Sequence, residues 1–269
     1  MKIICAGFPK TGTKSMAMAL RELGYSVYDF EEHVDFHLDK FVDFMDGVKD
    51  SAELMEAYKD VDVCIDQPAC TMWLTFFKHY PDAKVILMER ESSEAWFTSY
   101  TKMIDYYMAN YYVWYEDYLP LLSKTQATKN KLTQQCMIRS TASGNNFWQQ
   151  KHISKECWIY QYEMHNAAVK QLVPDNQLLV FKVGESWDRL CGFLDKPIPD
   201  KPFPRENMAG QAGNIVDQMQ EFKTQKRIEV EVRKSLTISG SCLALTVGMG
   251  VLAFVRPNLF SKVLNLIKL

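Results

Sequence analysis

The 269-residue sequence predicts an α/β fold, with a parallel β-sheet covered by helices on both faces and a transmembrane helix near the C-terminus. Three observations support this expectation. Short apolar runs alternate with helical patterns, which is typical of parallel strands joined by crossover helices. The first apolar run leads into a loop containing Gly7 and Gly12. A much longer apolar run near the C-terminus carries no charge.

The bulk composition excludes some classes of function. With 47% hydrophobic and 24% charged residues, the chain is expected to be globular with a sizeable core. The formal net charge of -2 gives no general attraction to nucleic acid, so no nucleic-acid partner is expected. The seven cysteines form no CxxC pair and no zinc-like spacing, which indicates reduced thiols in the cytosol.

The apolar pattern locates the individual elements. Strands are expected at residues 2–6, 25–28, 61–66, 84–89 and 178–183. Helices are expected at residues 14–23, within 31–59, at 70–80, from about 93, at 184–194 and at 208–234. Gly24 fits the C-terminal cap of the helix at 14–23, and Pro81 ends the helix at 70–80. We therefore expect an α/β domain over 1–207 and a polar helix or linker over 208–234.

Residues 235–255 are expected to span a membrane, followed by a short tail at 256–269. The run is long enough to cross the hydrocarbon core, and a buried helix of that length without a polar stripe is the less favoured alternative. Gly240, Ala244 and Gly248 recur every four residues, a pattern that suits helix pairing in lipid and hence a helix-mediated homodimer. Because the apolar N-terminal run is too short for a signal peptide, we expect a tail-anchored protein with its domain in the cytosol.

The loop at residues 7–15 has the features of an anion site. A strand–loop–helix arrangement places free backbone N–H groups and the positive end of the helix dipole at the loop. The common nucleoside-triphosphate loop reads G-x-x-x-x-G-K-[ST], but here Thr13 follows Gly12 where that pattern requires lysine. From the spacing alone, an ordinary turn, an altered kinase loop and a loop for another anion all remain open.

The segment P-K-T-G-T, residues 9–13, resembles the 5′-phosphosulfate loop of sulfotransferases. That resemblance implies a P-loop-like three-layer α/β/α fold. It also implies that the loop binds the 5′ side of 3′-phosphoadenosine 5′-phosphosulfate (PAPS), with no metal required. The implied cofactor-binding residues are Pro9, Lys10, Thr11, Gly12, Thr13, Lys14 and Ser15.

A second segment, KVILMERESSEAWFTSY, resembles the part of the family that holds the 3′-phosphate of PAPS. The resemblance assigns this role to Arg90, after the strand, and to a hydroxyl in the following helix. Ser99 is preferred, because Trp96 and Ser99 fit the family form R-D-P-x-x-W-x-x-S if one residue is inserted after Arg90. Thr98 is the alternative, because it lies at the family's usual spacing of eight residues after the arginine. The Asp-Pro that usually follows this arginine is missing here.

The block from residue 172 to residue 207 resembles the C-terminal block of a sulfotransferase-like family of eukaryotes and bacteria. Most matching positions, such as Trp187 and Phe203, are core residues and bear on the fold. Arg205 lies in a proline-fixed loop that the resemblance places near the nucleotide, so it is a further candidate for cofactor binding. The resemblance covers about residues 2–210 and leaves out the apolar run.

Two residues are expected to carry the chemistry. Lys10 suits the bridging oxygen of the leaving phosphate, a role that Lys14 can share. Asp66 ends a predicted strand, and the carboxyl ends of parallel strands open into the ligand crevice, so it is the expected base. The alternative for Asp66 is a helix cap. Asp29 is a second candidate, at a position where relatives often carry histidine.

Other features carry less weight. The aromatic stretch at 96–119 is expected mostly to pack against the sheet, with a few side chains walling a pocket for an apolar or phenolic acceptor. His33 and His37 lie four residues apart, but two histidines on a polar helix are usually solvated, so no metal site is expected.

The expected function is therefore a membrane-anchored sulfotransferase that moves a sulfuryl group from PAPS to a hydroxyl or amine of a small-molecule acceptor. A P-loop nucleoside triphosphatase or small-molecule kinase is one alternative, and it would need a lysine directly after Gly12. A nucleotide-binding membrane protein without turnover is the other. The absent Asp-Pro after Arg90 and the aspartate at position 29 favour that last alternative.

Overall fold

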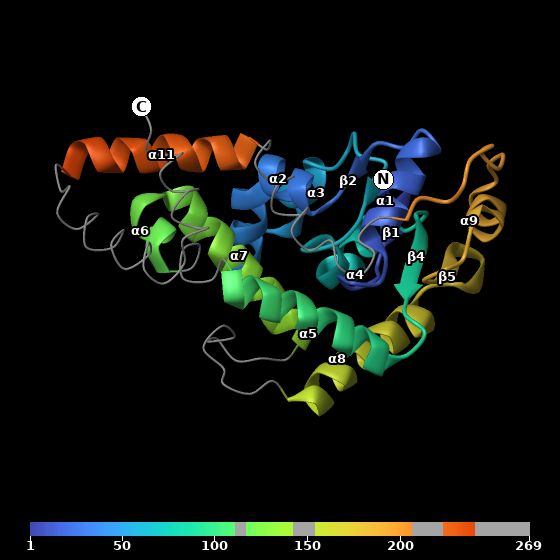
Figure 1. Cartoon of the computed structure of the whole chain (residues 1–269). Helices are drawn as coiled ribbons and strands as arrows, with labels where there is room; N and C mark the ends of the chain where they lie inside the picture. Colours follow the sequence, from blue (N-terminus) through green and yellow to red (C-terminus); the bar gives the residue numbers. More distant parts are fainter. Residues whose placement is uncertain (111–116, 142–153, 206–222, 240–269) are drawn as a thin grey trace.

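The computed structural model describes residues 1–110, 117–141, 154–205 and 223–239, and its centre is a five-stranded parallel sheet (Figure 1). The strand order is β2-β3-β1-β4-β5. The strands are β1 (Ile3–Cys5), β2 (Val27–Tyr28), β3 (Val63–Cys64), β4 (Lys84–Glu89) and β5 (Leu178–Lys182). All four strand pairings are parallel, so the predicted parallel α/β architecture is confirmed.

Helices connect the strands and continue beyond them. Those in the first half are α1 (Thr13–Glu22), α2 (Phe30–Met45), α3 (Ser51–Glu56), the 3₁₀ turn η1 (Ala69–Met72), α4 (Trp73–His79) and α5 (Ser93–Asn110). Those in the second half are α6 (Leu119–Leu122), α7 (Lys124–Thr141), α8 (Lys155–Leu172), the 3₁₀ turn η4 (Asp175–Gln177), α9 (Trp187–Leu194) and α11 (Lys223–Ser239).

Alternate residues of each strand face opposite sides of the sheet, which gives the three layers. Ile4 and Val85 face a core shared with α2, α3, α4 and α7. Ile3 and Ile86 face a second core shared with α1 and α9. Because both faces are buried, the strands read as continuous apolar runs rather than alternating ones.

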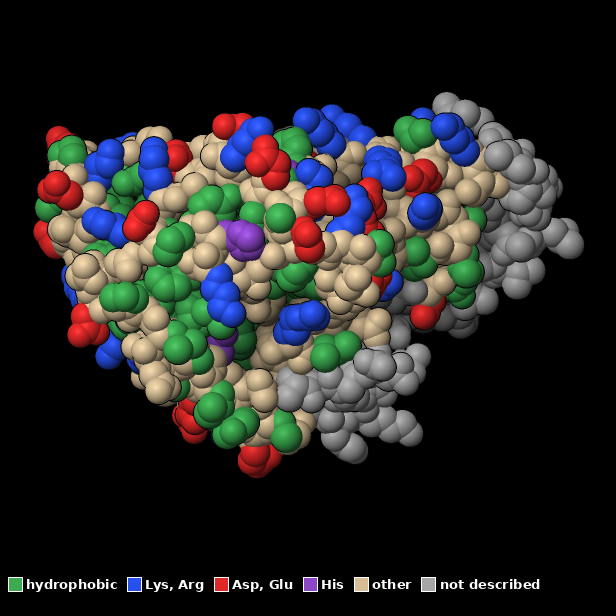
Figure 2. Space-filling model, turned by 180° about the vertical axis from the view of Figure 1, so that it is seen from behind, with side chains coloured by type: hydrophobic (Ala, Val, Ile, Leu, Met, Phe, Trp, Pro, Cys, Tyr) green, Lys and Arg blue, Asp and Glu red, His purple; other side chains and the backbone are tan. Residues whose placement is uncertain are grey.

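Charged side chains are mixed on the outside of the molecule. On the face seen in Figure 2, lysine and arginine side chains are interleaved with aspartate and glutamate. The surface of that face therefore carries no broad field of one sign.

A third core forms where α5 and α8 pack together beside the sheet. Trp96 lies between Tyr162 and Tyr100, with ring centroids 4.5 and 5.2 Å away, and Trp158 and Ile104 are also buried there. Of the described aromatic residues in the stretch 96–119, Trp96 and Tyr100 are buried in this core and Phe97 packs against it, whereas Tyr118 is exposed. Residues 111–116 of that stretch lie outside the described residues.

Helix α11 packs against α2, α6 and α7. Asp35 of α2 accepts hydrogen bonds from the backbone N–H groups of Lys223 and Thr224, which caps the start of α11. Its buried side chains Ile228 and Val232 meet Leu119 of α6. The second half of the expected polar helix is thus docked on the domain.

The expected transmembrane helix falls mainly on residues that the structure does not describe. Its first five positions, 235–239, continue α11 as helix, and residues 240–255 lie outside the described residues, as does the expected tail. No helix within the described residues is long and apolar enough to cross a membrane.

Two details differ from the sequence-based expectation. His33 and His37 are buried rather than solvated, because both lie on the face of α2 that packs on the sheet. His33 bridges the Tyr58 hydroxyl at 2.5 Å and the Ile65 carbonyl at 3.0 Å. The helices α6, α7 and α8 were also not anticipated from the pattern.

Candidate active site

The loop after β1 is held against the sheet by its first glycine. A Cβ atom added at Gly7 would lie 2.7 Å from the Met88 carbonyl oxygen of β4, so no larger residue fits there. Gly12 has φ of +91°, and Lys10 has φ of +72°, both in the left-handed region. Glycine adopts that region freely, whereas lysine enters it at a cost of about 1–2 kcal/mol. Gly7 therefore serves loop packing, and Gly12 and Lys10 shape the turn.

Side chains from distant elements tie the loop down. The Thr11 hydroxyl donates to the Phe8 carbonyl at 2.6 Å within the loop. The Trp96 indole N–H of α5 donates to the Pro9 carbonyl at 3.0 Å. His165 of α8 lies 2.7 Å through Nε2 from the Ala6 carbonyl oxygen, with its ring stacked on Phe8 at 4.0 Å. Burial lowers the pKa of His165 to about 4, so the ring is neutral at pH 7 and donates this hydrogen bond.

The loop opens onto the N-terminus of α1. Gly12 is the N-cap residue and makes no side-chain capping bond, and no acidic residue occupies the first turn. The positive end of the helix dipole therefore faces the loop without a neutralising carboxylate on its own helix. Lys10 adds a charge there. Burial lowers the pKa of its ammonium group, Asp66 opposes that shift, and Arg90 adds to it.

Arg90, directly after β4, reaches the same loop. One guanidinium nitrogen donates to the Lys10 carbonyl at 3.2 Å, and the same nitrogen lies 3.5 Å from the Ser99 hydroxyl. The Arg90 backbone N–H donates to the Tyr162 hydroxyl at 3.1 Å. Its Nε atom is buried and makes no hydrogen bond to any described residue, although the Glu91 carboxylate lies 3.5 Å away. The guanidinium therefore retains a donor that an anion could use.

The two hydroxyl candidates in α5 differ in their surroundings. Ser99 is half-buried and adjoins the Arg90 guanidinium. Thr98 is exposed, and its carbonyl accepts a hydrogen bond from Thr101. The helical turn thus directs Ser99, and not Thr98, to the arginine.

Asp66 follows β3 with φ of +66° and is 9% exposed. One carboxylate oxygen accepts the Gln67 backbone N–H at 2.7 Å, and Thr13 of the loop donates a further hydrogen bond. Burial and the nearby Asp29 carboxylate raise the pKa of Asp66, while Lys14 and Thr13 oppose the rise. Asp66 also contributes a carbonyl that accepts the Cys70 N–H at 2.8 Å, at the start of η1.

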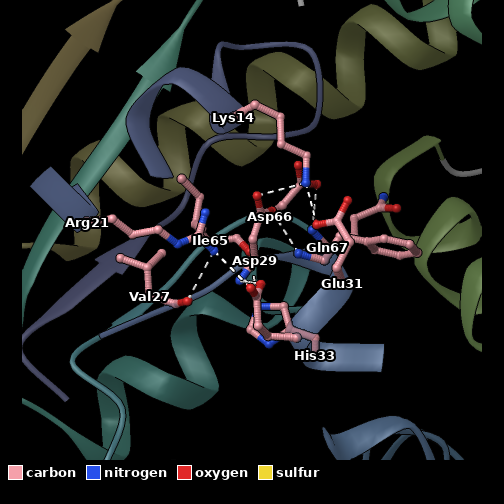
Figure 3. Close-up of polar contacts among 11 residues, drawn as sticks. Lys14, Arg21, Val27, Asp29, Glu31, His33, Ile65, Asp66 and Gln67 are labelled. Atoms are coloured by element: carbon pink, nitrogen blue, oxygen red, sulfur yellow. Dashed lines mark hydrogen bonds and ion pairs between the residues drawn. The ribbon is translucent and has the colours of Figure 1, made fainter. Parts of the chain in front are cut away.

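Lys14 points toward carboxylates, as Figure 3 shows. Its ammonium group lies 2.8 Å from Asp29, and it also forms an ion pair with Glu31. Asp29 caps α2 and completes a capping box with Glu32. Burial disfavours the charge on Lys14, but the neighbouring carboxylates outweigh it, so the pKa of Lys14 is raised.

Arg205 lies on the side of the site that β5 provides. It lines a cleft with Ser186 and Phe203, and its own side chain is exposed. The residue after β5, Val183, comes within 3.6 Å of a Cβ position at Gly12. The loops after β1 and β5 therefore meet, and the cleft opens beside them.

Comparison with known proteins shows the family of the chain. The sulfotransferase domain family matches residues 2–212. This chain belongs to the sulfotransferase domain family. "Ava biosynthesis cluster protein M" of Aspergillus versicolor is 29% identical over 227 residues, covering 80% of this chain and 83% of the relative.

A solved sulfotransferase from Alicyclobacillus acidocaldarius matches this sulfotransferase-family chain with a TM-score of 0.38 and 15% identity. That match covers 86% of this chain and 95% of the solved one. The family match over residues 2–212 confirms the predicted resemblance of the chain to the sulfotransferase family.

The structure brings most predicted site residues of this sulfotransferase-family protein to one edge of the sheet. The loop from Pro9 to Ser15 follows β1, Asp66 follows β3, and Arg90 follows β4. Thr98 is exposed, and Arg205 lies in the cleft beside the loops after β1 and β5. Within the described residues, no group of three or more His, Cys, Asp or Glu side chains could hold a metal ion.

Three residues that support the site of this sulfotransferase-family protein were not predicted from the sequence in that role. They are Trp96, Tyr162 and His165, which hold the loop and the Arg90 backbone. Tyr162 and His165 are three residues apart and so share one face of α8, with Trp158 and Val169 buried on the same helix. That spacing was a usable signal for a buried helix face, although it does not name the partner.

Proposed function

We propose that the chain transfers a sulfuryl group from PAPS to a hydroxyl or amine of a small-molecule acceptor. One observation carries the proposal: the Arg90 guanidinium donates to the Lys10 carbonyl at 3.2 Å. The two elements predicted to hold the 3′-phosphate and the 5′-phosphosulfate therefore adjoin one another. The family of the chain supports sulfuryl transfer in general.

In this proposal the donor lies across the loops after β1, β4 and β5. The uncapped start of α1 and the loop from Pro9 to Ser15 would bind the 5′-phosphosulfate. Arg90 and Ser99 would bind the 3′-phosphate, and Arg205 would approach the nucleotide from the cleft beside Ser186. The buried Nε atom of Arg90 without a hydrogen bond supports an anion at that place.

The transfer itself is an in-line displacement at sulfur. A bond forms between the acceptor oxygen or nitrogen and sulfur, and the bond between sulfur and the bridging phosphate oxygen breaks. The electron pair of that bond leaves with adenosine 3′,5′-bisphosphate, where the Lys10 ammonium group can stabilise the growing charge. Lys14 is less suited to this role, because its ammonium group already pairs with Asp29 and Glu31.

Asp66 would accept the proton of the acceptor. It follows β3, the neighbour of β1, and a hydrogen bond from Thr13 links it to the donor loop. A carboxylate whose pKa is raised by burial is a stronger base than an ordinary aspartate, provided that it is ionised at the working pH. Asp29 is the weaker candidate, since its carboxylate already pairs with Lys14 and caps α2.

We further propose that residues 235–255 anchor the protein in a membrane, with the domain on the cytosolic side and helix pairing through Gly240, Ala244 and Gly248. The absence of charge in this run and its small-xxx-small spacing support the proposal. Partition of the full chain and of a chain ending at Ser239 between detergent and aqueous phases tests it.

Calorimetry with adenosine 3′,5′-bisphosphate and transfer from radiolabelled PAPS to a panel of phenols, alcohols and amines test the enzyme proposal. Lys10→Ala is expected to lose transfer by about a hundredfold or more while remaining folded. The matched control is Lys59→Ala, which removes an exposed lysine after α3 that pairs only with Glu56 among the contacts of the described chain.

Failure of adenosine 3′,5′-bisphosphate to bind would contradict the donor assignment. Binding without transfer to any acceptor would instead favour the alternative of a non-catalytic nucleotide-binding protein. Hydrolysis of ATP that requires magnesium would restore the kinase-like alternative, although Thr13 occupies the position of its lysine.

A further inference from the structure

Helix α11 leads directly into the apolar run that is proposed to anchor the protein. Residues 235–239 belong both to this helix and to the run, and no charged residue follows Lys234 until Arg256. At about 1.5 Å per residue, a helix over 235–255 would be about 31 Å long, which matches the thickness of about 30 Å of a hydrocarbon core. A span of that length has no residues to spare, so Ser235 would lie close to the lipid headgroups.

The short helix α6 is fixed to this end of α11 (Figure 1). Leu119 of α6 packs with Ile228 and Val232 of α11. Further along both helices, the Ser235 hydroxyl donates to the Leu122 carbonyl at 2.8 Å. The C-terminal end of α6 therefore reaches the level of Ser235, where the apolar run begins.

The turn after α6 is bonded to the same part of α11. The Glu231 carboxylate accepts hydrogen bonds from the Ser123 hydroxyl at 2.7 Å and from the backbone N–H and hydroxyl of Thr125 at 2.9 and 2.7 Å. Burial raises the pKa of Glu231, but these hydrogen bonds and Arg227 outweigh burial and lower the pKa to about 2. The carboxylate is therefore ionised at neutral pH, and these bonds hold α6 to the end of α11.

The outer side of α6 is apolar. Tyr118 and Leu121, which we call the α6 tip, are three residues apart and are 38% and 79% exposed, whereas Leu119 and Leu122 pack toward α11. The value for Leu121 is the highest among the described large apolar side chains. A single exposed leucine is ordinary elsewhere on a protein, but this one directly precedes the residue that bonds to Ser235. Its position therefore suits contact with lipid.

Basic side chains flank the α6 tip. Arg233 and Lys234 are exposed at the end of α11, and Lys124 is exposed directly after the turn that follows α6. Asp117 is an exposed acidic residue of the same region. Basic side chains beside a membrane span attract anionic headgroups, and tyrosine is enriched at the boundary between headgroups and hydrocarbon. The composition of this surface therefore matches that of a membrane interface.

We propose that the α6 tip and the last turns of α11 lie against the membrane surface, with Leu121 and Tyr118 entering the interface. The partner is a lipid bilayer with anionic headgroups, which Arg233 and Lys234 would contact. The inference rests on the proposed anchoring through residues 235–255, and it adds an orientation of the domain. Two contacts, the span and the α6 tip, would restrict rotation of the domain above the membrane.

Photochemical cross-linking of the full chain in vesicles tests the contact with lipid. The photoreactive residue p-benzoylphenylalanine replaces Leu121 in one variant and Ile198, an apolar residue that is 56% exposed, in the matched control. Ile198 follows α9, which lies at the opposite end of the molecule from α6 (Figure 1). In vesicles of phosphatidylcholine and phosphatidylserine, the yield of lipid adduct is expected to be about tenfold higher at position 121.

A second comparison tests the basic side chains. The share of phosphatidylserine among the adducts at position 121 is expected to exceed its share in the vesicle about fivefold. Arg233→Gln together with Lys234→Gln should remove most of this excess. Lys49→Gln together with Lys59→Gln removes the same charge from two exposed lysines near α3, and this control should leave the excess unchanged.

Equal yields of lipid adduct at positions 121 and 198 overturn the inference, as does cross-linking of position 121 to a second copy of the chain in place of lipid. An unchanged share of phosphatidylserine in the Arg233→Gln, Lys234→Gln protein overturns the assignment of anionic headgroups. Extraction of the same vesicles at alkaline pH separates the two proposals. A protein that resists extraction but forms no adduct at position 121 contradicts this inference alone, whereas a fully extracted protein contradicts the anchoring and the inference with it.

Discussion

The loop after β1 and the segment after β3 both meet at the carboxyl edge of the sheet, yet they are built differently. The loop after β1 is held by side chains from outside it, with Trp96 on Pro9 and His165 on Ala6. The segment after β3 is held mainly by hydrogen bonds within itself, with the Gln67 and Cys70 N–H groups donating to Asp66, and it places the buried Asp66 carboxyl group beside Lys14 and Asp29. The difference teaches that hydrogen bonds fix both segments, whereas the segment after β3 also carries a buried carboxyl group whose charge depends on pH.

The largest effect is expected from a change in the segment after β3. Asp66→Asn removes the proposed base and should lower kcat by about a hundredfold to ten-thousandfold, while adenosine 3′,5′-bisphosphate still binds. Steady-state transfer and calorimetry measure the two quantities. Asp62→Asn, at the other end of β3 where Asp62 pairs with Lys2, is the control and should change neither. A variant of Asp66 with normal turnover would assign the base elsewhere.

The rate should also depend on pH through Asp66. Its pKa is raised in the folded protein, so the acidic limb of kcat/KM is expected above about pH 4, the ordinary value for aspartate. The rate increases with pH through that limb, because the carboxylate form is the base. An acidic limb at or below the ordinary pKa of aspartate would show that the attraction of Lys14 for the Asp66 carboxylate outweighs the effects of burial and Asp29 on its pKa.

Arg90 follows β4 and contacts the loop after β1 through the Lys10 carbonyl. Arg90→Ala should weaken binding of adenosine 3′,5′-bisphosphate by about tenfold to a hundredfold, since a charged hydrogen bond contributes about 1.5–3 kcal/mol. Arg90→Lys should recover only part of the loss, because lysine cannot bind a phosphate through two nitrogens. Calorimetry of the three proteins measures this. Equal affinity of the wild type and Arg90→Ala would remove Arg90 from the donor site.

Trp96→Phe tests whether packing alone fixes the loop. It removes the hydrogen bond to the Pro9 carbonyl but keeps an aromatic ring between Tyr100 and Tyr162. Loss of one such bond costs about 1 kcal/mol, so nucleotide affinity should fall about fivefold, with a decrease of a few degrees in Tm. Unchanged affinity with a lower Tm would mean that Trp96 supports the fold and not the loop.

The smallest effect separates Ser99 from Thr98. Ser99→Ala should weaken nucleotide binding about threefold to fivefold, because its hydroxyl adjoins Arg90, whereas Thr98→Ala should leave it unchanged. The two adjacent variants are each other's control in the same calorimetric assay. The reverse order would indicate that the helix turns when nucleotide binds.

Much of the sheet could be predicted from the sequence because buried parallel strands read as plain apolar runs. The strand expected at 84–89 matches β4, and Gly24, with φ of +86°, ends the first helix as expected. The loop at 7–15 was also recognisable, since its residues are consecutive. Its link to Arg90 followed from a resemblance and not from the pattern, because eighty residues separate Lys10 from Arg90.

Helix α7 could not be predicted in the same way. Helix α7 is polar along most of its length, and only tertiary contacts decide which of its side chains, such as Leu132 and Cys136, become buried. The partners of Lys14 were missed for a similar reason. Asp29 and Glu32 have the spacing of a capping box, which marks the start of α2, but no pattern shows that this helix begins beside α1.

The backbone of Gly7 packs directly against Met88 of β4, so contact with this neighbouring strand fixes the position of the loop after β1. Arg90 leaves that same strand two residues after Met88. The separation of the two elements proposed to grip the nucleotide is thus dictated by strand pairing. The binding site for a nucleotide that fits this spacing is therefore preorganised, so binding would cost little conformational entropy of the loops.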